Sequence, residues 1–69
     1  MGVEILSKEG CQYCDMAVDL CKEYNLENEK IMVDKDELKK RCGNSASVYP
    51  QILLNDELIG TYFDFQDYL

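Results

Sequence analysis

Two cysteines three positions apart are the residues of this sequence best suited to chemistry. Cys11-Gln12-Tyr13-Cys14 comes after a short apolar strand and opens a stretch with helical periodicity. At this spacing the first thiol lies at the start of the helix and the second lies one turn inside it, so the two can form a reversible disulfide. Because a helix N-terminus favours a thiolate, we expect Cys11 to attack disulfides and the more buried Cys14 to resolve the mixed disulfide.

A pair of closely spaced cysteines can also be half of a zinc site. Such a site needs four ligands, which would come from a second cysteine pair or from histidines. The chain has four cysteines and no histidine, and the other two cysteines, Cys21 and Cys42, are isolated in the sequence. We expect Cys21 on the buried stripe of the first helix and Cys42 at the end of the second, both as ordinary thiols, and we assign no metal ligands.

The size and charge of the chain limit its class. Its 69 residues suit a single domain, residues 1–69, and the apolar share of 46% is that of a folded soluble protein. A net charge of −7 disfavours nucleic acid and anionic membranes, and the one basic run, Lys39-Lys40-Arg41, fits the end of a helix. We find no membrane-spanning run and no secretory signal, so we expect a cytoplasmic protein.

The apolar periodicity predicts the element order β-α-β-α-β-β-α. Gly43 and Asn44 are expected to end the second helix, and Asn55-Asp56 to form a tight hairpin turn. The inner contacts of the last helix are predicted to be Phe65, Tyr68 and Leu69. The strands are predicted at residues 3–6, about 30–33, 51–54 and 57–59, and the helices at residues 13–24, 36–42 and 63–69.

Three stretches of the chain resemble the glutaredoxin family, and they cover essentially its whole length. They are the strand and Cys-x-Tyr-Cys segment of residues 3–14, the sequence Val48-Tyr49-Pro50-Gln51-Ile52, and the glycine-containing segment Ile59-Gly60-Thr61-Tyr62-Phe63-Asp64-Phe65. The resemblance implies an α/β, thioredoxin-like fold in a minimal short form, with a four-stranded mixed sheet. It also implies a cis peptide bond between Tyr49 and Pro50.

A glutathione site follows from the same resemblance. In the family pattern, Lys8 would bind the glycine carboxylate, with Arg41 as a weaker candidate, and the backbone of Tyr49 at Pro50 would pair with the peptide. The amides of Phe63 and Asp64 would receive the γ-glutamyl carboxylate, and Asp64 would face the ammonium or serve as a plain N-cap. The groove would be lined by Tyr13 and Tyr62.

Four residues depart from the family pattern. Gln12 stands where a proline is common, and Tyr49 is bulkier than the small aliphatic residue usual before the proline. Thr61 replaces the second glycine of a Gly-Gly pair, and Phe63 replaces a small or polar residue. We expect Tyr49, Thr61 and Phe63 to narrow or crowd the glutathione site.

These features favour a glutathione-dependent thiol–disulfide oxidoreductase that reduces protein disulfides or glutathione mixed disulfides through Cys11 and Cys14. It would hold no tightly bound cofactor, use glutathione as reducing co-substrate, and act as a monomer on disulfide-containing proteins. One alternative is a redoxin dedicated to ribonucleotide reductase and recharged by thioredoxin reductase. Another is an iron–sulfur carrier in which Cys11 and glutathione from two chains hold one cluster.

Overall fold

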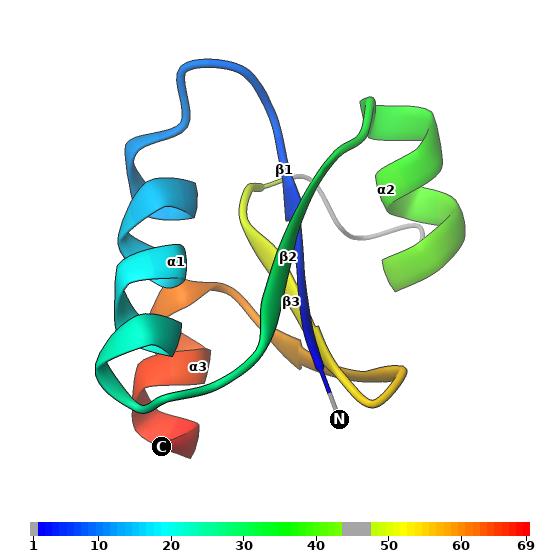
Figure 1. Ribbon diagram of the computed structural model, residues 1–69. Coiled ribbons are helices and arrows are strands. Elements are labelled where there is room, and N and C mark those ends of the chain that lie inside the picture. Colours follow the sequence, from blue (N-terminus) through cyan, green and yellow to red (C-terminus); the bar gives the residue numbers. More distant parts are fainter. Residues whose placement is uncertain (1, 44–47) are drawn as a thin grey trace.

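The computed structural model describes residues 2–43 and 48–69, and its elements follow the expected order (Figure 1). The strands are β1 (Val3–Ser7), β2 (Asn28–Met32), β3 (Gln51–Leu54) and β4 (Glu57–Gly60). The helices are α1 (Gln12–Glu23), α2 (Lys35–Cys42) and α3 (Tyr62–Tyr68). No helix in the described part of the chain is long and apolar enough to cross a bilayer.

The four strands form one mixed sheet in the order β2-β1-β3-β4. β1 pairs in parallel with β2, and the remaining neighbours, β1 with β3 and β3 with β4, are antiparallel. The parallel pair needs a crossover, which α1 supplies, whereas β3 and β4 are joined by the two-residue turn at Asn55 and Asp56. The expectation of a four-stranded mixed sheet is confirmed.

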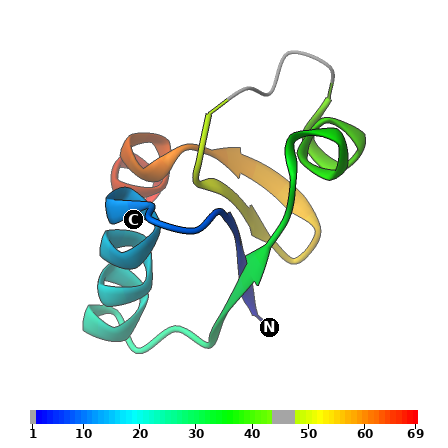
Figure 2. The ribbon, with the colours of Figure 1, turned by 90° about the horizontal axis from the view of Figure 1, so that it is seen from above.

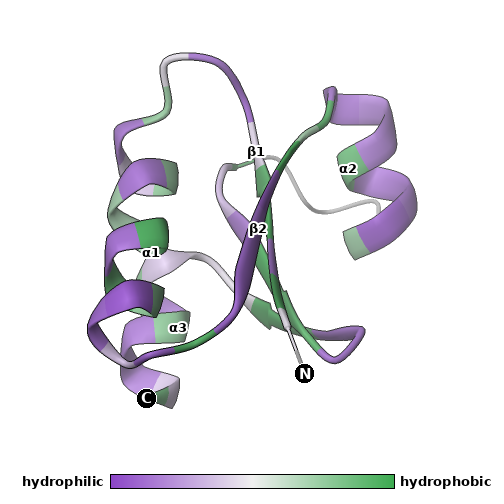
Figure 3. Cartoon of the chain, in the orientation of Figure 1, coloured by the Kyte–Doolittle hydropathy of each residue, from purple (hydrophilic) through white to green (hydrophobic). Residues whose placement is uncertain are grey.

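Helices cover both faces of this sheet. α1 and α3 lie side by side on one face and α2 lies on the other, as the two perpendicular views show (Figures 1 and 2). Figure 3 shows apolar positions on β1 and on the inner side of α1, while α2 is mostly hydrophilic. The larger core therefore lies between the sheet and the α1–α3 pair, and its fully or almost fully buried members are Val3, Ile5, Ala17, Leu20, Cys21, Ile52 and Phe65.

The face under α2 holds a smaller core of Leu6, Leu38 and Leu53. Leu6 points to this side because successive residues of β1 alternate between the faces of the sheet. Cys42 and Tyr49 pack against the same cluster, and the Tyr49 hydroxyl donates a hydrogen bond of 2.8 Å to the Val33 carbonyl oxygen. α2 is thus anchored through one buried side chain, Leu38, with partly buried neighbours.

Turn and cap positions agree with their residue types. Asn55 and Asp56 have φ values of 52° and 66°, as a two-residue hairpin turn with both central residues left-handed requires. Gly43 caps α2 at φ 100°, as predicted, while Asn44 lies outside the described residues. α2 begins at Lys35, one residue before the expected start, because the Asp34 side chain accepts a 2.8 Å hydrogen bond from the Glu37 amide.

The start of β2 lies two residues from its expected position, and every other boundary lies at most one residue from its own. β2 begins at Asn28 rather than at about residue 30, since parallel pairing of Val3 with Asn28 recruits polar residues into the strand. α3 begins at Tyr62 rather than at Phe63, and its N-cap is Thr61. The alternative of Asp64 as the N-cap is therefore wrong.

The predicted inner contacts of α3 are correct at one position of three. Phe65 is fully buried, but Tyr68 is 56% exposed and Leu69 38% exposed. α3 has only seven residues, and its last turn continues beyond the core that Phe65 fills. Periodicity alone could not show where the neighbouring core stops.

Candidate functional site

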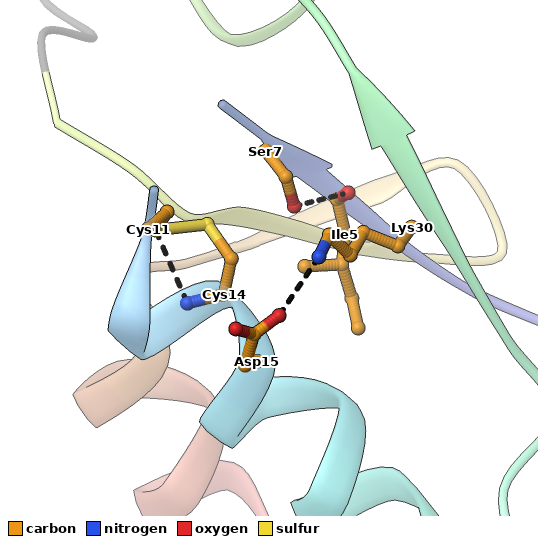
Figure 4. A network of polar contacts seen from close by, with 6 residues as sticks. All are labelled: Ile5, Ser7, Cys11, Cys14, Asp15 and Lys30. Carbon is orange, nitrogen blue, oxygen red and sulfur yellow. Dashed lines mark hydrogen bonds and ion pairs between the residues drawn. A yellow bond between two sulfur atoms is a disulfide. The ribbon is translucent and has the colours of Figure 1, made fainter. Parts of the chain in front are cut away.

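Cys11 and Cys14 meet at the first turn of α1. Gly10, at φ 74°, turns the chain into Cys11, whose extended backbone makes it the N-cap of the helix. The Cys11 Sγ accepts a 3.1 Å hydrogen bond from the Cys14 amide, and the two sulfur atoms are joined in a disulfide with Cα atoms 5.2 Å apart (Figure 4). The spacing in the sequence thus produces a redox pair at a helix N-terminus.

The two sulfurs differ in access to solvent. Cys11 is half-buried, whereas Cys14 is fully buried, as its position on the helix stripe predicts. An attacking or attacked thiolate must be reachable from outside, and a resolving thiol need only reach its neighbour. The arrangement therefore suits a disulfide whose outer sulfur is Cys11.

Polar contacts fix the elements around the pair. The buried Ser7, at the end of β1, donates a 3.0 Å hydrogen bond to the Ile5 carbonyl oxygen. Lys30 of β2 forms a 2.7 Å ion pair with Asp15, the residue after Cys14 (Figure 4). Both partners are well exposed, so the pair contributes roughly 0–1 kcal/mol and serves mainly to join the first turn of α1 to the sheet.

An apolar pocket of about 220 Å³ lies beside the redox pair. It is lined by Tyr13, Val48, Tyr49, Pro50, Thr61, Tyr62 and Phe63. The peptide bond between Tyr49 and Pro50 is cis, as the family resemblance implied. The structure thus brings five of the expected binding residues to one pocket, next to the helix start that carries Cys11.

The aromatic lining forms a contiguous cluster. The ring centroids of Tyr13 and Tyr62 are 5.7 Å apart, those of Tyr13 and Phe63 are 5.3 Å apart, and those of Tyr62 and Phe63 are 5.4 Å apart. The ring planes of the first two pairs are tilted and those of the third are edge-on, and such non-parallel arrangements at these separations are favourable for aromatic pairs. The cluster joins the first turn of α1 to the first turn of α3.

The three expected charged residues have different positions. The Lys8 ammonium lies 5.6 Å from the centre of the Tyr49 ring, beside the pocket. Asp64 does not line the pocket but contacts the lining residue Thr61, whose amide and hydroxyl donate to its Oδ2 at 3.0 and 3.2 Å. Arg41 lies on the α2 face, 3.4 Å from Glu4, and does not line the pocket.

Two lining residues, Val48 and Thr61, were not expected as site residues. Thr61 was considered only as a departure from the family glycine, although Thr61 and Asp64 have the spacing of a capping box, a signal for the start of α3. Nothing in the types of the residues around Val48 marks it as a pocket residue. Its place depends on the fold around Pro50.

The comparisons with known proteins identify the family. The glutaredoxin family model matches residues 3–59, which is most of the chain. This chain belongs to the glutaredoxin family. It is 28% identical to glutaredoxin 1 of Escherichia coli strain K12 and to glutaredoxin 1 of Shigella flexneri, in alignments covering 94% of this chain and 88% of each relative.

Solved structures agree with this assignment. The structure of reduced E. coli glutaredoxin superposes with a TM-score of 0.74 at 27% identity, covering 99% of this chain and 92% of that one. The oxidised E. coli protein has a TM-score of 0.71 over the same coverage. This glutaredoxin therefore has the thioredoxin-like fold, and its cysteine pair is that of a thiol–disulfide oxidoreductase.

The remaining cysteines of this glutaredoxin lie in two different cores. Cys21 is fully buried in the α1–α3 core, and burial raises the pKa of its thiol. Burial also raises the pKa of Cys42, on the α2 face, and the Arg41 guanidinium partly opposes that shift. In the described part of the chain, no group of three or more cysteine, aspartate or glutamate residues is arranged to hold a metal ion.

Proposed function

We propose that this glutaredoxin is a glutathione-dependent oxidoreductase that reduces protein disulfides and glutathione mixed disulfides. The observation that carries the proposal is the contrast between Cys11, accessible at the N-terminus of α1, and Cys14, fully buried one turn later. The Cys11 thiolate attacks a substrate disulfide, which releases one thiolate and leaves the other half bonded to Cys11. The Cys14 thiolate then attacks Sγ of Cys11 and releases the second thiol.

Two glutathione molecules would return the oxidised pair to the dithiol. The first attacks Cys11, which frees Cys14 and leaves glutathione bonded to Cys11, and the second attacks that glutathione sulfur. The products are the reduced protein and glutathione disulfide, so two electrons pass from glutathione to the substrate.

The pocket beside Cys11 supports this assignment. Glutathione has carboxylates at both ends, and Lys8 is a cation at one side of the pocket. At the other side the amides of Phe63 and Asp64, in the first turn of α3, would receive the γ-glutamyl carboxylate. The Thr61 amide and the Thr61 hydroxyl both donate to Oδ2 of Asp64, so Oδ1 can accept from the glutathione ammonium.

The remaining residues of the proposed site would shape the groove. Tyr13 and Tyr62 would pack along the glutathione backbone, while the backbone at Tyr49 and Pro50 would pair with its cysteine residue. We further propose that the protein works as a monomer in the cytoplasm on disulfide-containing proteins. A reducing compartment suits the two unpaired cysteines, Cys21 and Cys42.

The test is the reduction of a small glutathione mixed disulfide, coupled to glutathione reductase and its nicotinamide cofactor. We expect Cys11→Ser to abolish turnover and Cys14→Ser to retain it, because glutathione itself can resolve a mixed disulfide at Cys11. Cys42→Ser, a change at a half-buried cysteine on the opposite face, is the matched control and should behave as wild type. A wild-type protein that is reduced by thioredoxin reductase, and not by glutathione, would refute the glutathione assignment.

A further inference from the structure

The mouth of the pocket beside the disulfide presents large apolar side chains to solvent. Phe63 is 56% exposed, Val48 52% and Tyr13 43%, and all three line the same pocket. Exposed aromatic surface adds little to folding stability, since that stability comes from area removed from water. A concentration of such surface around a concave site beside a reactive group indicates contact with a partner.

The cluster is also held in place before any partner arrives. Phe63 contacts both Tyr13 and Tyr62, at centroid distances of 5.3 and 5.4 Å. Its backbone lies in the first turn of α3, which the Thr61–Asp64 hydrogen bonds fix. A rigid aromatic surface loses little conformational freedom on binding, so it can select an apolar side chain.

A second hollow continues from Tyr62 along the groove between α1 and α3. It has a volume of about 250 Å³ and is lined by Met16, Asp19, Leu20, Glu23 and Tyr62. Tyr62 lines both hollows, so they adjoin. Among the described residues neither Asp19 nor Glu23 takes part in an ion pair, and the whole chain carries a net charge of −7.

The two hollows favour a ligand whose charge and side chains differ from those of glutathione. Glutathione is itself anionic and carries no apolar side chain beyond its cysteine. An acidic groove attracts cations, and an aromatic pocket of this size suits one apolar side chain next to the reacting cysteine. Both features fit a polypeptide that crosses the pocket and continues over the α1–α3 groove.

We infer that the preferred substrates are disulfides of polypeptides in which an aromatic residue adjoins the reactive cysteine and basic residues lie farther along the chain. The aromatic side chain occupies the Tyr13–Tyr62–Phe63 pocket, and the basic residues face Asp19 and Glu23. This inference rests on the proposed function, because it concerns the partner that becomes bonded to Cys11.

The test uses an exchange equilibrium on the Cys14→Ser variant, in which a mixed disulfide at Cys11 persists. One peptide thiol attacks Sγ of Cys11 in its mixed disulfide with a second peptide, forms a new disulfide to Cys11 and releases the second peptide as a thiol. The peptides are capped, carry one cysteine flanked on both sides by Phe or by Ala, and end in two Lys or two Glu residues. Intact mass spectrometry gives the ratio of the competing mixed disulfides, and glutathione is a further competitor.

We expect the Phe peptide to outcompete the Ala peptide by roughly fivefold to tenfold, and the Lys peptide to outcompete the Glu peptide by roughly threefold at low salt. Phe63→Thr should reduce the aromatic preference to below about twofold. The matched control is Tyr68→Thr, since Tyr68 is also 56% exposed and in α3 but does not line the pocket. The double variant Asp19→Asn, Glu23→Gln should remove the charge preference only.

The inference is overturned if the Phe and Ala peptides compete equally, if the Lys and Glu peptides do, or if Tyr68→Thr removes the aromatic preference as fully as Phe63→Thr. Failure of the proposed function has a different signature. In that case neither the peptides nor glutathione form a mixed disulfide at Cys11. Any adduct seen on Cys14→Ser is then also seen on the Cys11→Ser, Cys14→Ser double variant. A Cys14→Ala background gives the same comparison if Cys14→Ser folds poorly.

Discussion

Cys11 and Cys42 are both half-buried cysteines at the end of a helix, yet their surroundings favour opposite chemistry. Cys11 caps the N-terminus of α1, where the free amides and the dipole stabilise a thiolate. Cys42 is the last residue of α2, at the negative end of the dipole, and burial raises its pKa. The helix end on which each residue lies therefore favours the proposed nucleophile at Cys11 and a protonated thiol at Cys42.

The largest losses of stability should come from substitutions in the two cores, one on each face of the sheet. Phe65→Ala should lower the free energy of unfolding by about 3–5 kcal/mol, because it empties the α1–α3 core under the aromatic pocket. Leu38→Ala should cost about 2–4 kcal/mol, since it removes the one fully buried side chain of α2. Urea unfolding of the oxidised protein measures both values.

Leu38→Ala also tests whether the two faces of the sheet unfold independently. Leu38→Ala should speed alkylation of Cys42 by loosening α2, while the rate at Cys11 stays unchanged. A parallel rise at both cysteines would show that the two faces unfold together and are not independent.

The contrast between Cys11 and Cys42 is tested by alkylating the reduced protein with iodoacetamide at pH 7. Cys11 should react at least about a hundredfold faster than Cys42, because only a thiolate reacts and a raised pKa leaves Cys42 protonated. Below that pKa, each further pH unit raises the Cys42 thiolate about tenfold, so the gap should narrow as the pH rises. Peptide mass spectrometry gives the two rates, and equal rates at pH 7 would contradict the comparison.

Gly60, before α3, and Gly43, after α2, form a matched pair of positions at which smaller losses of stability are expected. Both glycines have a positive φ, 126° at Gly60 and 100° at Gly43. A Cβ added at Gly60 would contact the Asp64 carboxylate, whereas no described atom lies within 4 Å of a Cβ added at Gly43. Gly60→Ala should therefore cost about 2–3 kcal/mol and Gly43→Ala about 1 kcal/mol. Thermal unfolding measures both.

Removing the obstructing side chain checks the assigned cause. In the Gly60→Ala, Asp64→Ala double variant, the loss should be smaller than the sum of the two single losses, because the contact with the carboxylate is gone. Additive losses would assign the whole cost of Gly60→Ala to its backbone conformation.

The smallest effects concern Arg41. Arg41→Gln should raise the pKa of Cys42 further and slow its alkylation at pH 7 by roughly twofold to fivefold, because the guanidinium lowers that pKa. Glu4→Gln breaks the 3.4 Å ion pair with Arg41 but leaves the cation, so it is the control and should alter the rate little. Either change should cost less than about 1 kcal/mol of stability.

The sequence by itself determined the redox pair and the order of the elements. The three-residue spacing of Cys11 and Cys14, at the start of an apolar stripe, sets one sulfur at the helix N-terminus and one inside it. Asn55, Asp56 and Gly43 mark turns because their backbone conformations suit few other residues. These are local properties, decided within a few residues of the chain.

Only the tertiary structure decided what surrounds the pair. Phe63 and Tyr13 are 50 positions apart and meet because α1 and α3 pack on the same face of the sheet. Arg41 was a candidate for the binding site, yet α2 packs on the other face and pairs it with Glu4. Contacts between distant segments depend on which face of the sheet each helix covers, and local periodicity does not contain that information.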